Sequence, residues 1–278
     1  MKQCASNKYL QKVLNRLHQF ESSGENWRLI LGDSCQMEQI QDDSVKLVLT
    51  SPPYFDKCTE KLLRMPRKFQ KEYDQVRQEV ATYAASFMST FQEVWRVMEE
   101  GGHLIIQTKD LRYGGCLIPL TNLHRNLAES LGFRMVDKIY LRRKADRRSR
   151  SKYFLSRHDF RIFQVDDLDD FLVFKKPGES RFNLNKIPIE LLSEYANPVW
   201  HLPSTGSNKT HPYQCPLEPL RRFINLYSNE GDLILDPFAG HGTTLRVAVS
   251  MRRKAIGWEI NQDHFKIATK KLSGKFRA

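Results

Sequence analysis

The stretch LILDPFAGHGTT, residues 233–244, combines an apolar run, an acidic residue and a turn that contains two glycines. The run LIL predicts a buried strand that ends at Asp236, and residues 243–251 predict a helix directly after the turn. Gly240 and Gly242 let the backbone approach a ligand closely, and the start of the helix presents free backbone amides. The stretch therefore predicts a strand, a ligand-binding turn and a helix, which is a building unit of α/β folds.

Other apolar runs along the chain lie beside helical patterns in the same way. The runs that predict buried strands are residues 27–31, 45–49, 102–107 and 255–258, and an amphipathic stretch covers 83–98. Strands that alternate with helices at this spacing predict a mostly parallel sheet with helices on both faces. Residues 133–141 and 170–174 have no convincing helix between them, so we expect an antiparallel pair at one edge of the sheet.

The length allows one large α/β domain over residues 1–278, and two domains are possible but not required. With 40% hydrophobic and 27% charged residues, the composition is that of an ordinary globular protein. No apolar run approaches the roughly 20 residues of a membrane span, and the start of the chain lacks the apolar stretch of a signal peptide, so we expect a cytoplasmic protein. The 5 cysteines form no C-x-x-C pair, and we expect reduced thiols and no metal site.

Glu259 adds a second feature of a cofactor site, because it follows the run at 255–258 about twenty residues after the glycine turn. An acidic residue at the end of the second strand is suited to binding a ribose diol. A Walker-type phosphate loop would need a lysine, which the Gly242-Thr243 pair lacks, and a dinucleotide fingerprint would need a glycine where Leu245 stands. The remaining candidate is a cofactor without a pyrophosphate, for which S-adenosylmethionine is the natural choice.

Three motifs in order carry a resemblance to a known family. They are TSPPY at 50–54, HPYQCP at 211–216 and DPFAGHGTT at 236–244. Together they resemble the DNA amino-methyltransferases of the β group, in which the catalytic motif precedes the cofactor motif. The resemblance covers the chain from about Trp27 to the last predicted helix. It implies the Rossmann-like α/β fold of methyltransferases that use S-adenosylmethionine as the methyl donor. The implied activity is that of a site-specific DNA methyltransferase, which is typically paired with a restriction endonuclease that acts on the same site.

The resemblance also implies roles for individual residues. The implied cofactor-binding residues are Asp33, His211, Pro212, Asp236, Phe238, Gly240, Gly242, Thr243 and Glu259. The implied catalytic residues are Ser51, Pro52, Pro53 and Tyr54. Cys215 stands where the family often has a lysine, so the segment around it departs from the family pattern.

The S-P-P-Y tetrapeptide fits the methylation of an exocyclic amine. Such an amine is a poor nucleophile, because its lone pair is delocalised into the base. The Ser51 hydroxyl and the Pro52 carbonyl could accept hydrogen bonds from the amine and concentrate electron density on nitrogen. The two prolines would hold this geometry rigidly, and Tyr54 would stack on a base flipped out of the duplex.

Ser51 also bears on the choice of base. Adenine-specific relatives usually carry Asp before Pro-Pro, whereas Ser resembles the cytosine-N4 enzymes. Adenine N6 stays open as an alternative, as do an RNA substrate and a binding subunit whose active site has decayed. Methylation of cytosine C5 is disfavoured because the sequence contains no Pro-Cys pair to supply the thiolate nucleophile.

A net charge of +12 favours a polyanionic partner, and double-stranded DNA is the partner that the resemblance implies. The candidate phosphate-binding residues are Arg142, Arg143, Lys144, Arg147, Arg148, Arg150 and Lys152, supported by Arg64, Arg67, Lys68 and Lys71. Target-recognition segments are expected at roughly 142–169 and 177–210. The second of these is polar and interrupted by prolines, which predicts exposed loops.

Overall fold

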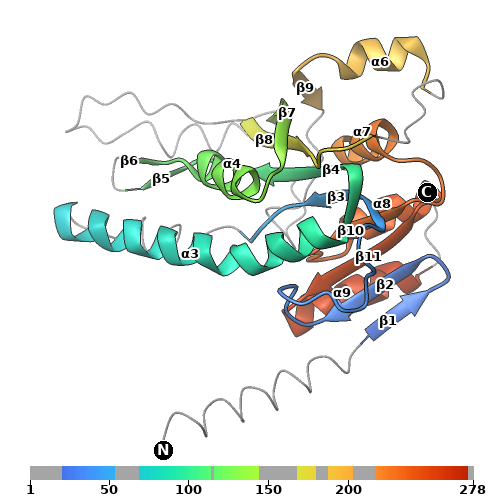
Figure 1. Cartoon of the computed structure of the whole chain (residues 1–278), viewed down its shortest axis with the longest axis horizontal. Coiled ribbons are helices and arrows are strands. Elements are labelled where there is room, and N and C mark those ends of the chain that lie inside the picture. Colours follow the sequence, from blue (N-terminus) through green and yellow to red (C-terminus); the bar gives the residue numbers. More distant parts are fainter. Residues whose placement is uncertain are drawn as a thin grey trace, which may run out of the picture.

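One nine-stranded sheet forms the centre of the molecule (Figure 1). The computed structural model describes residues 21–53, 69–113, 116–143, 168–179, 187–202 and 217–274. Within these residues the strands of the sheet are β1 (Glu21–Gly24), β2 (Trp27–Leu31), β3 (Val45–Thr50), β4 (Met98–Thr108), β7 (Arg134–Arg143), β8 (Leu168–Lys175), β9 (Val199–Leu202), β10 (Leu233–Asp236) and β11 (Lys254–Glu259). Their spatial order is β1-β2-β11-β10-β3-β4-β8-β7-β9.

The middle of the sheet is parallel, as the sequence predicts. Strands β2, β11, β10, β3 and β4 are parallel neighbours in that order. All six residues of β3 are buried, which explains why this strand reads as a continuous apolar run rather than as an alternating one. Strand β10, which leads into the glycine turn, pairs directly with β3, which leads into the S-P-P turn.

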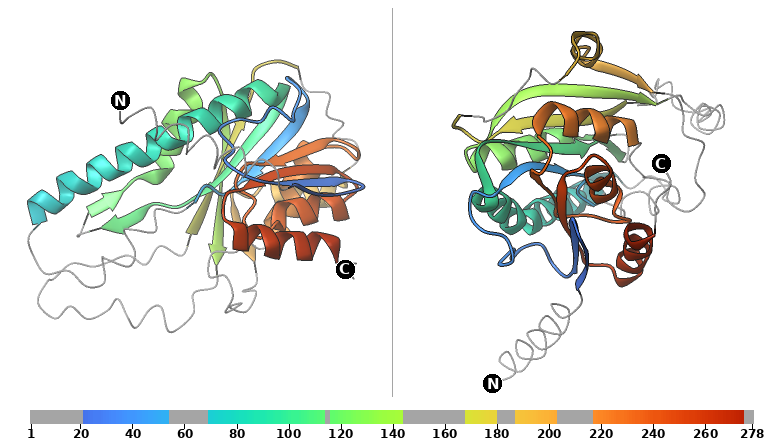
Figure 2. Two further views of the ribbon diagram at one scale, coloured as in Figure 1. Left: turned by 90° about the horizontal axis from the view of Figure 1, so that it is seen from below. Right: turned by 90° about the vertical axis from the view of Figure 1, so that its right-hand side faces the viewer.

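Helices cover both faces of the sheet (Figure 2). The helices α3 (Phe69–Val97) and α4 (Leu120–Ser130) pack on one face, and α7 (Leu217–Tyr227), α8 (Thr243–Ser250) and α9 (Gln262–Ser273) pack on the other. Alternate residues of β3 serve the two cores, because Val48 packs with α3 while Leu47 and Leu49 pack with α7 and α8. A separate hairpin of β5 (Leu111–Tyr113) and β6 (Cys116–Ile118) follows β4. In the described ranges, no helix combines the length and the apolar character that crossing a membrane requires.

The antiparallel pair expected from 133–141 and 170–174 is confirmed, but it does not lie at the edge. Strand β8 pairs with β4 and with β7 in antiparallel fashion, and β9 then pairs with the outer side of β7 in parallel fashion. The prediction of exposed loops at 177–210 is therefore wrong for two parts of that segment, the helix α6 (Ile189–Tyr195) and the strand β9.

Aromatic packing explains this difference. Trp200 of β9 is buried, and its ring lies 4.9 Å from that of Phe223 in α7. Burial of so large a side chain stabilises a strand that the neighbouring prolines disfavour.

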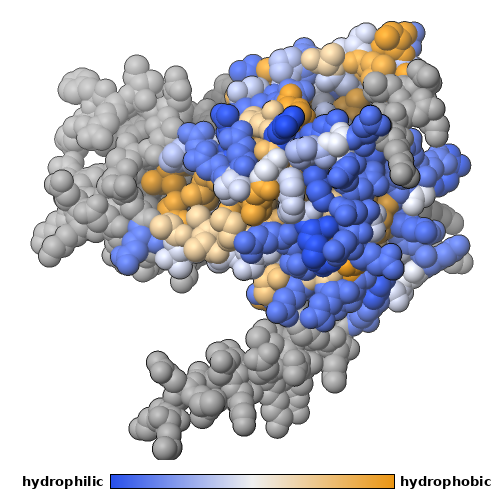
Figure 3. Space-filling view, in the orientation of Figure 1, coloured by the Kyte–Doolittle hydropathy of each residue, from blue (hydrophilic) through white to orange (hydrophobic). Residues whose placement is uncertain are grey.

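On the outside, α6 exposes Ile189 and Leu191, and the surface at α6 is correspondingly hydrophobic (Figure 3).

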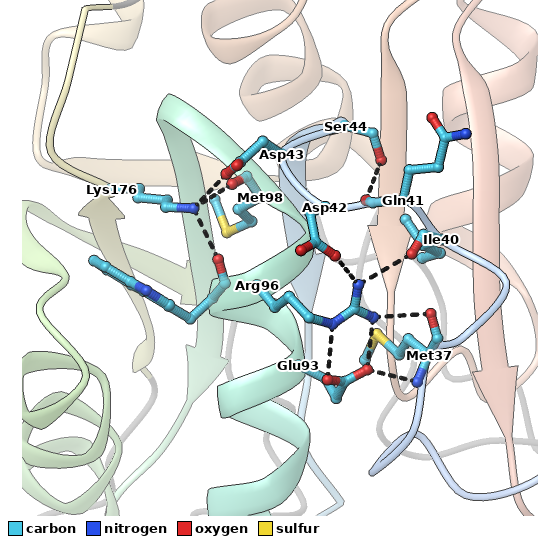
Figure 4. A network of polar contacts seen from close by, with 11 residues as sticks. Met37, Ile40, Gln41, Asp42, Asp43, Ser44, Glu93, Arg96, Met98 and Lys176 are labelled. Atoms are coloured by element: carbon cyan, nitrogen blue, oxygen red, sulfur yellow. Dashed lines mark hydrogen bonds and ion pairs between the residues drawn. The ribbon is translucent and has the colours of Figure 1, made fainter.

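Two buried or half-buried cations fix the segment that leads into β3 (Figure 4). Arg96, near the end of α3, donates to the carbonyls of Met37 at 3.0 Å and Ile40 at 3.2 Å and pairs with Glu93 and Asp42. Lys176, just after β8, donates to Asp43 at 2.7 Å and to the carbonyls of Trp95 and Met98 at 2.9 and 2.6 Å. Together they set where β3 begins.

Replacing Arg96 with methionine should lower the free energy of unfolding by about 1–3 kcal/mol, because two backbone carbonyls and two carboxylates lose a charged donor. Urea denaturation measures the change. Arg125→Met is the matched control, since Arg125 makes one exposed ion pair with Glu129 on α4, and its cost should be at most about 0.5 kcal/mol. Equal effects of the two substitutions would contradict the anchoring role of Arg96.

Candidate functional site

A cavity of about 540 Å³ opens at the carboxyl ends of the parallel strands. This volume is typical of a site for a small molecule or cofactor. The residues around it follow β2, β3, β10 and β11, because parallel strands end at the same edge of a sheet. The predicted site residues that line the cavity are Asp33, Ser51, Pro52, Pro53, Asp236, Phe238, Gly240, Thr243 and Glu259.

Asp236 is the most deeply buried acid of the cavity. Its Oδ1 accepts a hydrogen bond from the Thr50 hydroxyl at 2.7 Å and from the backbone amide of Phe238 at 3.1 Å, and the Thr244 side chain also bonds to the carboxylate. Burial raises the pKa of Asp236 to about 6, against these hydrogen bonds, and the charge of Glu259 adds to the increase. The carboxylate therefore joins the end of β3 to the turn after β10.

The turn after β10 depends on two glycines with positive φ angles, 53° at Gly240 and 72° at Gly242. Gly240 lines the cavity. Gly242 does not: a side chain there would meet Ala268 at 3.2 Å and Leu272 at 3.3 Å, so this glycine allows α8 and α9 to pack closely. Gly242 is also the N-cap of α8 and provides no side-chain cap, and the positive end of the helix dipole at this point favours an anionic group.

Glu259 ends β11 at the rim of the cavity and is 8% exposed. Its Oε1 accepts a hydrogen bond from the amide of Asn261 at 2.7 Å, and its carbonyl accepts one from Gly32 at 3.1 Å. The second bond places the turn that carries Asp33 beside β11, where the Asp33 Oδ1 accepts the amide of Cys35 at 3.0 Å. Three acidic side chains from three turns thus surround one cavity.

The S-P-P turn forms another wall. Ser51 is half-buried, Pro52 is buried and Pro53 is exposed. The Ser51 hydroxyl makes no hydrogen bond to another residue that the structure describes, so it is available to a bound molecule. Tyr54, His211 and Pro212 lie outside the described residues, and their predicted roles stay predictions.

Several lining residues were not among those predicted. Phe87 of α3 packs edge-on against Phe238 with ring centres 5.3 Å apart. Gln107 lies at the end of β4 and donates to Asp169 at 3.3 Å, with both residues buried. Gln107 could have been found, because it follows the apolar run of β4 just as Asp236 follows that of β10. Phe87 could not, because a helix core position shows no such signal.

The basic residues predicted to bind phosphate lie mostly outside the described ranges. Arg142 is exposed near the end of β7 and does not line the cavity, and Arg143 is the last residue of that strand. Lys71 falls within α3. The residues outside the described ranges are Lys144, Arg147, Arg148, Arg150, Lys152, Arg64, Arg67 and Lys68.

The donor set of the cavity fits S-adenosylmethionine. A sulfonium cation is stabilised by nearby carboxylates, which Asp33, Asp236 and Glu259 provide. The uncapped start of α8 suits a carboxylate, and the apolar side chains of Phe238 and Ile260 suit an adenine ring.

Comparisons with known proteins agree with this geometry. A family model described as DNA methylase matches residues 45–270. The type II methyltransferase M.MjaI of Methanocaldococcus jannaschii is 27% identical over 90% of this chain and 92% of its own. Two solved structures share the fold. TTHA0409 of Thermus thermophilus, complexed with S-adenosyl-L-methionine, has a TM-score of 0.68 at 23% identity over 89% of this chain and 95% of that one. The cytosine-N4-specific PvuII DNA methyltransferase has a TM-score of 0.70 at 19% identity, over 94% and 92% respectively.

The pKa of Asp236 predicts a pH-dependent stability difference. Since the folded-state pKa of about 6 lies above the ordinary 3.8, the folded protein binds this proton more tightly, and ionisation costs stability as the pH rises through that window. The stability of Asp236→Asn relative to the wild type should therefore increase by up to about 3 kcal/mol between pH ~4 and pH ~8. Urea denaturation of both proteins without cofactor measures this difference, and a difference that does not vary with pH would refute it.

Proposed function

Because this chain belongs to the N6/N4 DNA methylase family, we propose that it transfers a methyl group from S-adenosylmethionine to the exocyclic N4 of cytosine, at a specific site in duplex DNA. Its being a DNA methyltransferase follows from the family model, which matches most of the chain. Its cofactor is S-adenosylmethionine, for which the cavity has suitable groups. The choice of cytosine N4, the residue roles and the partners are the proposal.

One observation carries the proposal: the S-P-P turn and the glycine turn face the same cavity. The strands that precede them are paired in the sheet, and the bond between Thr50 and Asp236 joins their ends at 2.7 Å. A reacting amine held at Ser51 would therefore lie beside a cofactor held at the glycine turn, which is the proximity that a direct transfer requires.

The cofactor supplies an activated methyl group when it is bound. On this chain, Glu259 would accept hydrogen bonds from the ribose hydroxyls, and the first turn of α8 would bind the amino-acid carboxylate. Phe238 and Ile260 would form apolar walls for the adenine. Asp33 would lie near the same ring.

Ser51 and Pro52 would orient the amine. The Ser51 hydroxyl, which bonds no other residue that the structure describes, and the Pro52 carbonyl would accept hydrogen bonds from its two N–H groups and direct the nitrogen lone pair into the cavity. A serine is also a donor, so it can bond to the ring nitrogen beside the N4 amine of cytosine. Adenine offers a similar ring nitrogen, so the choice of cytosine rests on the resemblance, in which adenine-specific relatives usually carry Asp before Pro-Pro.

The DNA side of the proposal rests on sequence features. The target base would be flipped from the duplex and stack on Tyr54, while basic residues from Arg142 to Lys152 bind phosphates. Target recognition would come from residues 142–169 and 177–210. The relative M.MjaI is named a type II methyltransferase, and we extend the proposal to a restriction endonuclease that cleaves the same site.

Ser51→Ala should lower kcat for DNA methylation by about 100- to 1000-fold, because the amine loses an acceptor that acts during transfer. The dissociation constant of S-adenosylmethionine, measured by calorimetry, should stay within about twofold of the wild-type value. Ser250→Ala, an exposed serine at the end of α8, is the control and should leave both values unchanged. A wild-type kcat for Ser51→Ala would exclude the proposed role.

Nucleoside analysis of DNA from cells that express the protein decides the base. We expect N4-methylcytosine at one recognition sequence. N6-methyladenine would overturn the choice of base while leaving the enzyme class intact. Purified protein that binds the cofactor but labels only structured RNA, or no nucleic acid, would overturn the proposed function itself.

A further inference from the structure

We propose that Tyr83 is a positioning residue, which together with His124 and Thr108 fixes the peptide that follows the S-P-P turn. This inference rests on the proposed function, because it assigns the turn to the catalytic site. The three residues come from α3, α4 and the end of β4, so the proposed clamp ties the turn to both helices on one face of the sheet.

The clamp is a chain of hydrogen bonds. The Tyr83 hydroxyl lies 2.9 Å from the carbonyl oxygen of Pro53 and 3.5 Å from Nε2 of His124. The other ring nitrogen, Nδ1 of His124, lies 2.8 Å from the Thr108 hydroxyl. His124 is 2% exposed, and Tyr83 is partly buried.

The carbonyl of Pro53 determines which atoms donate and which accept in this series of hydrogen bonds. A carbonyl only accepts, so the Tyr83 hydroxyl must donate to it. The Tyr83 oxygen can then only accept from His124, which places the imidazole proton on Nε2. Nδ1 is left as an acceptor, and Thr108 donates to it. Burial lowers the pKa of His124 to about 4, which keeps the ring neutral at physiological pH, as this arrangement requires.

The clamp acts on the torsion that the prolines leave free. The two rings fix φ at Pro52 and Pro53, and a following proline restricts the backbone of both Ser51 and Pro52. The main remaining freedom is ψ of Pro53, which sets the direction of its carbonyl and of the chain that enters Tyr54. A hydrogen bond to that carbonyl removes this freedom, so Tyr83 would fix the end of the S-P-P turn.

Ring packing holds the clamp in place and links it to the cofactor turn. The Tyr83 ring packs edge-on against Phe87 with centres 4.5 Å apart, and Phe87 packs edge-on against Phe238 at 5.3 Å. Phe87 also lies 6.5 Å from the His124 ring. Removal of the Tyr83 hydroxyl alone therefore leaves these ring contacts in place and removes the polar contacts of the hydroxyl, those with Pro53 and His124 among them.

Kinetics of Tyr83→Phe tests the clamp. We expect kcat to fall by about 10- to 100-fold, because a small displacement of a reacting group has that effect, while the dissociation constant of S-adenosylmethionine stays within about twofold. Tyr227→Phe is the matched control, a partly buried tyrosine of α7 whose ring packs on His103, and it should leave kcat unchanged. An unchanged kcat in Tyr83→Phe would overturn the inference. A fall in kcat that comes with weaker cofactor binding and a lower melting temperature would also overturn it, because the loss would then reflect a general disruption of the fold.

A second measurement separates the clamp from the proposed function. Nitrogen-15 NMR of the histidine side chains should show neutral His124 protonated at Nε2, with its Nε2 resonance shifted in Tyr83→Phe and unaffected in Tyr227→Phe. A His124 protonated at Nδ1 would refute the clamp even if the protein methylates DNA. Failure of the wild-type protein to methylate DNA would refute the proposed function while the NMR result still stood.

Discussion

The hydrogen bond between the Thr50 hydroxyl and the Asp236 carboxylate is the contact on which the site depends. It joins residues 186 positions apart at the ends of two adjacent parallel strands. The same carboxylate orders the following turn through the amide of Phe238. A single buried acceptor thereby sets the distance between the S-P-P turn and the glycine turn. The energetic cost of burying this charge is evident in its raised pKa, and the hydrogen bonds from Thr50, Phe238 and Thr244 offset only part of it.

Helix α3 fixes β3 at both of its ends. Arg96, near the carboxyl end of the helix, holds the segment before the strand, and Tyr83, about four turns earlier, holds the peptide after it. Between these points the apolar face of the helix, including Phe87 and Phe91, packs on the sheet. Contacts with a single long helix therefore position the short strand that leads into the S-P-P turn.

The sequence predicts the parts of this molecule that local pattern determines. Apolar runs followed by a charged or glycine-containing turn identify the parallel strands, and these turns then meet because of the topology. Contacts made by packing carry no such pattern. Strand β9 forms because its Trp200 packs against Phe223 of α7. The hydrogen bond from Tyr83 to Pro53 joins a helix surface to a turn 30 residues away. The close approach at Gly242 is another such contact, since a side chain there would meet Ala268 and Leu272 of α9.

The strand order also constrains how the chain can fold during synthesis. Strands β2 and β3 are made early, but β10 and β11, which lie between them, are made only from residue 233 onwards. Until then the two early strands each present an unpaired edge at the centre of the future sheet. Such long-range pairing slows folding and exposes edges that can pair with other chains. The cofactor cavity, bounded by all four strands, therefore completes only when residues 233–259 have left the ribosome.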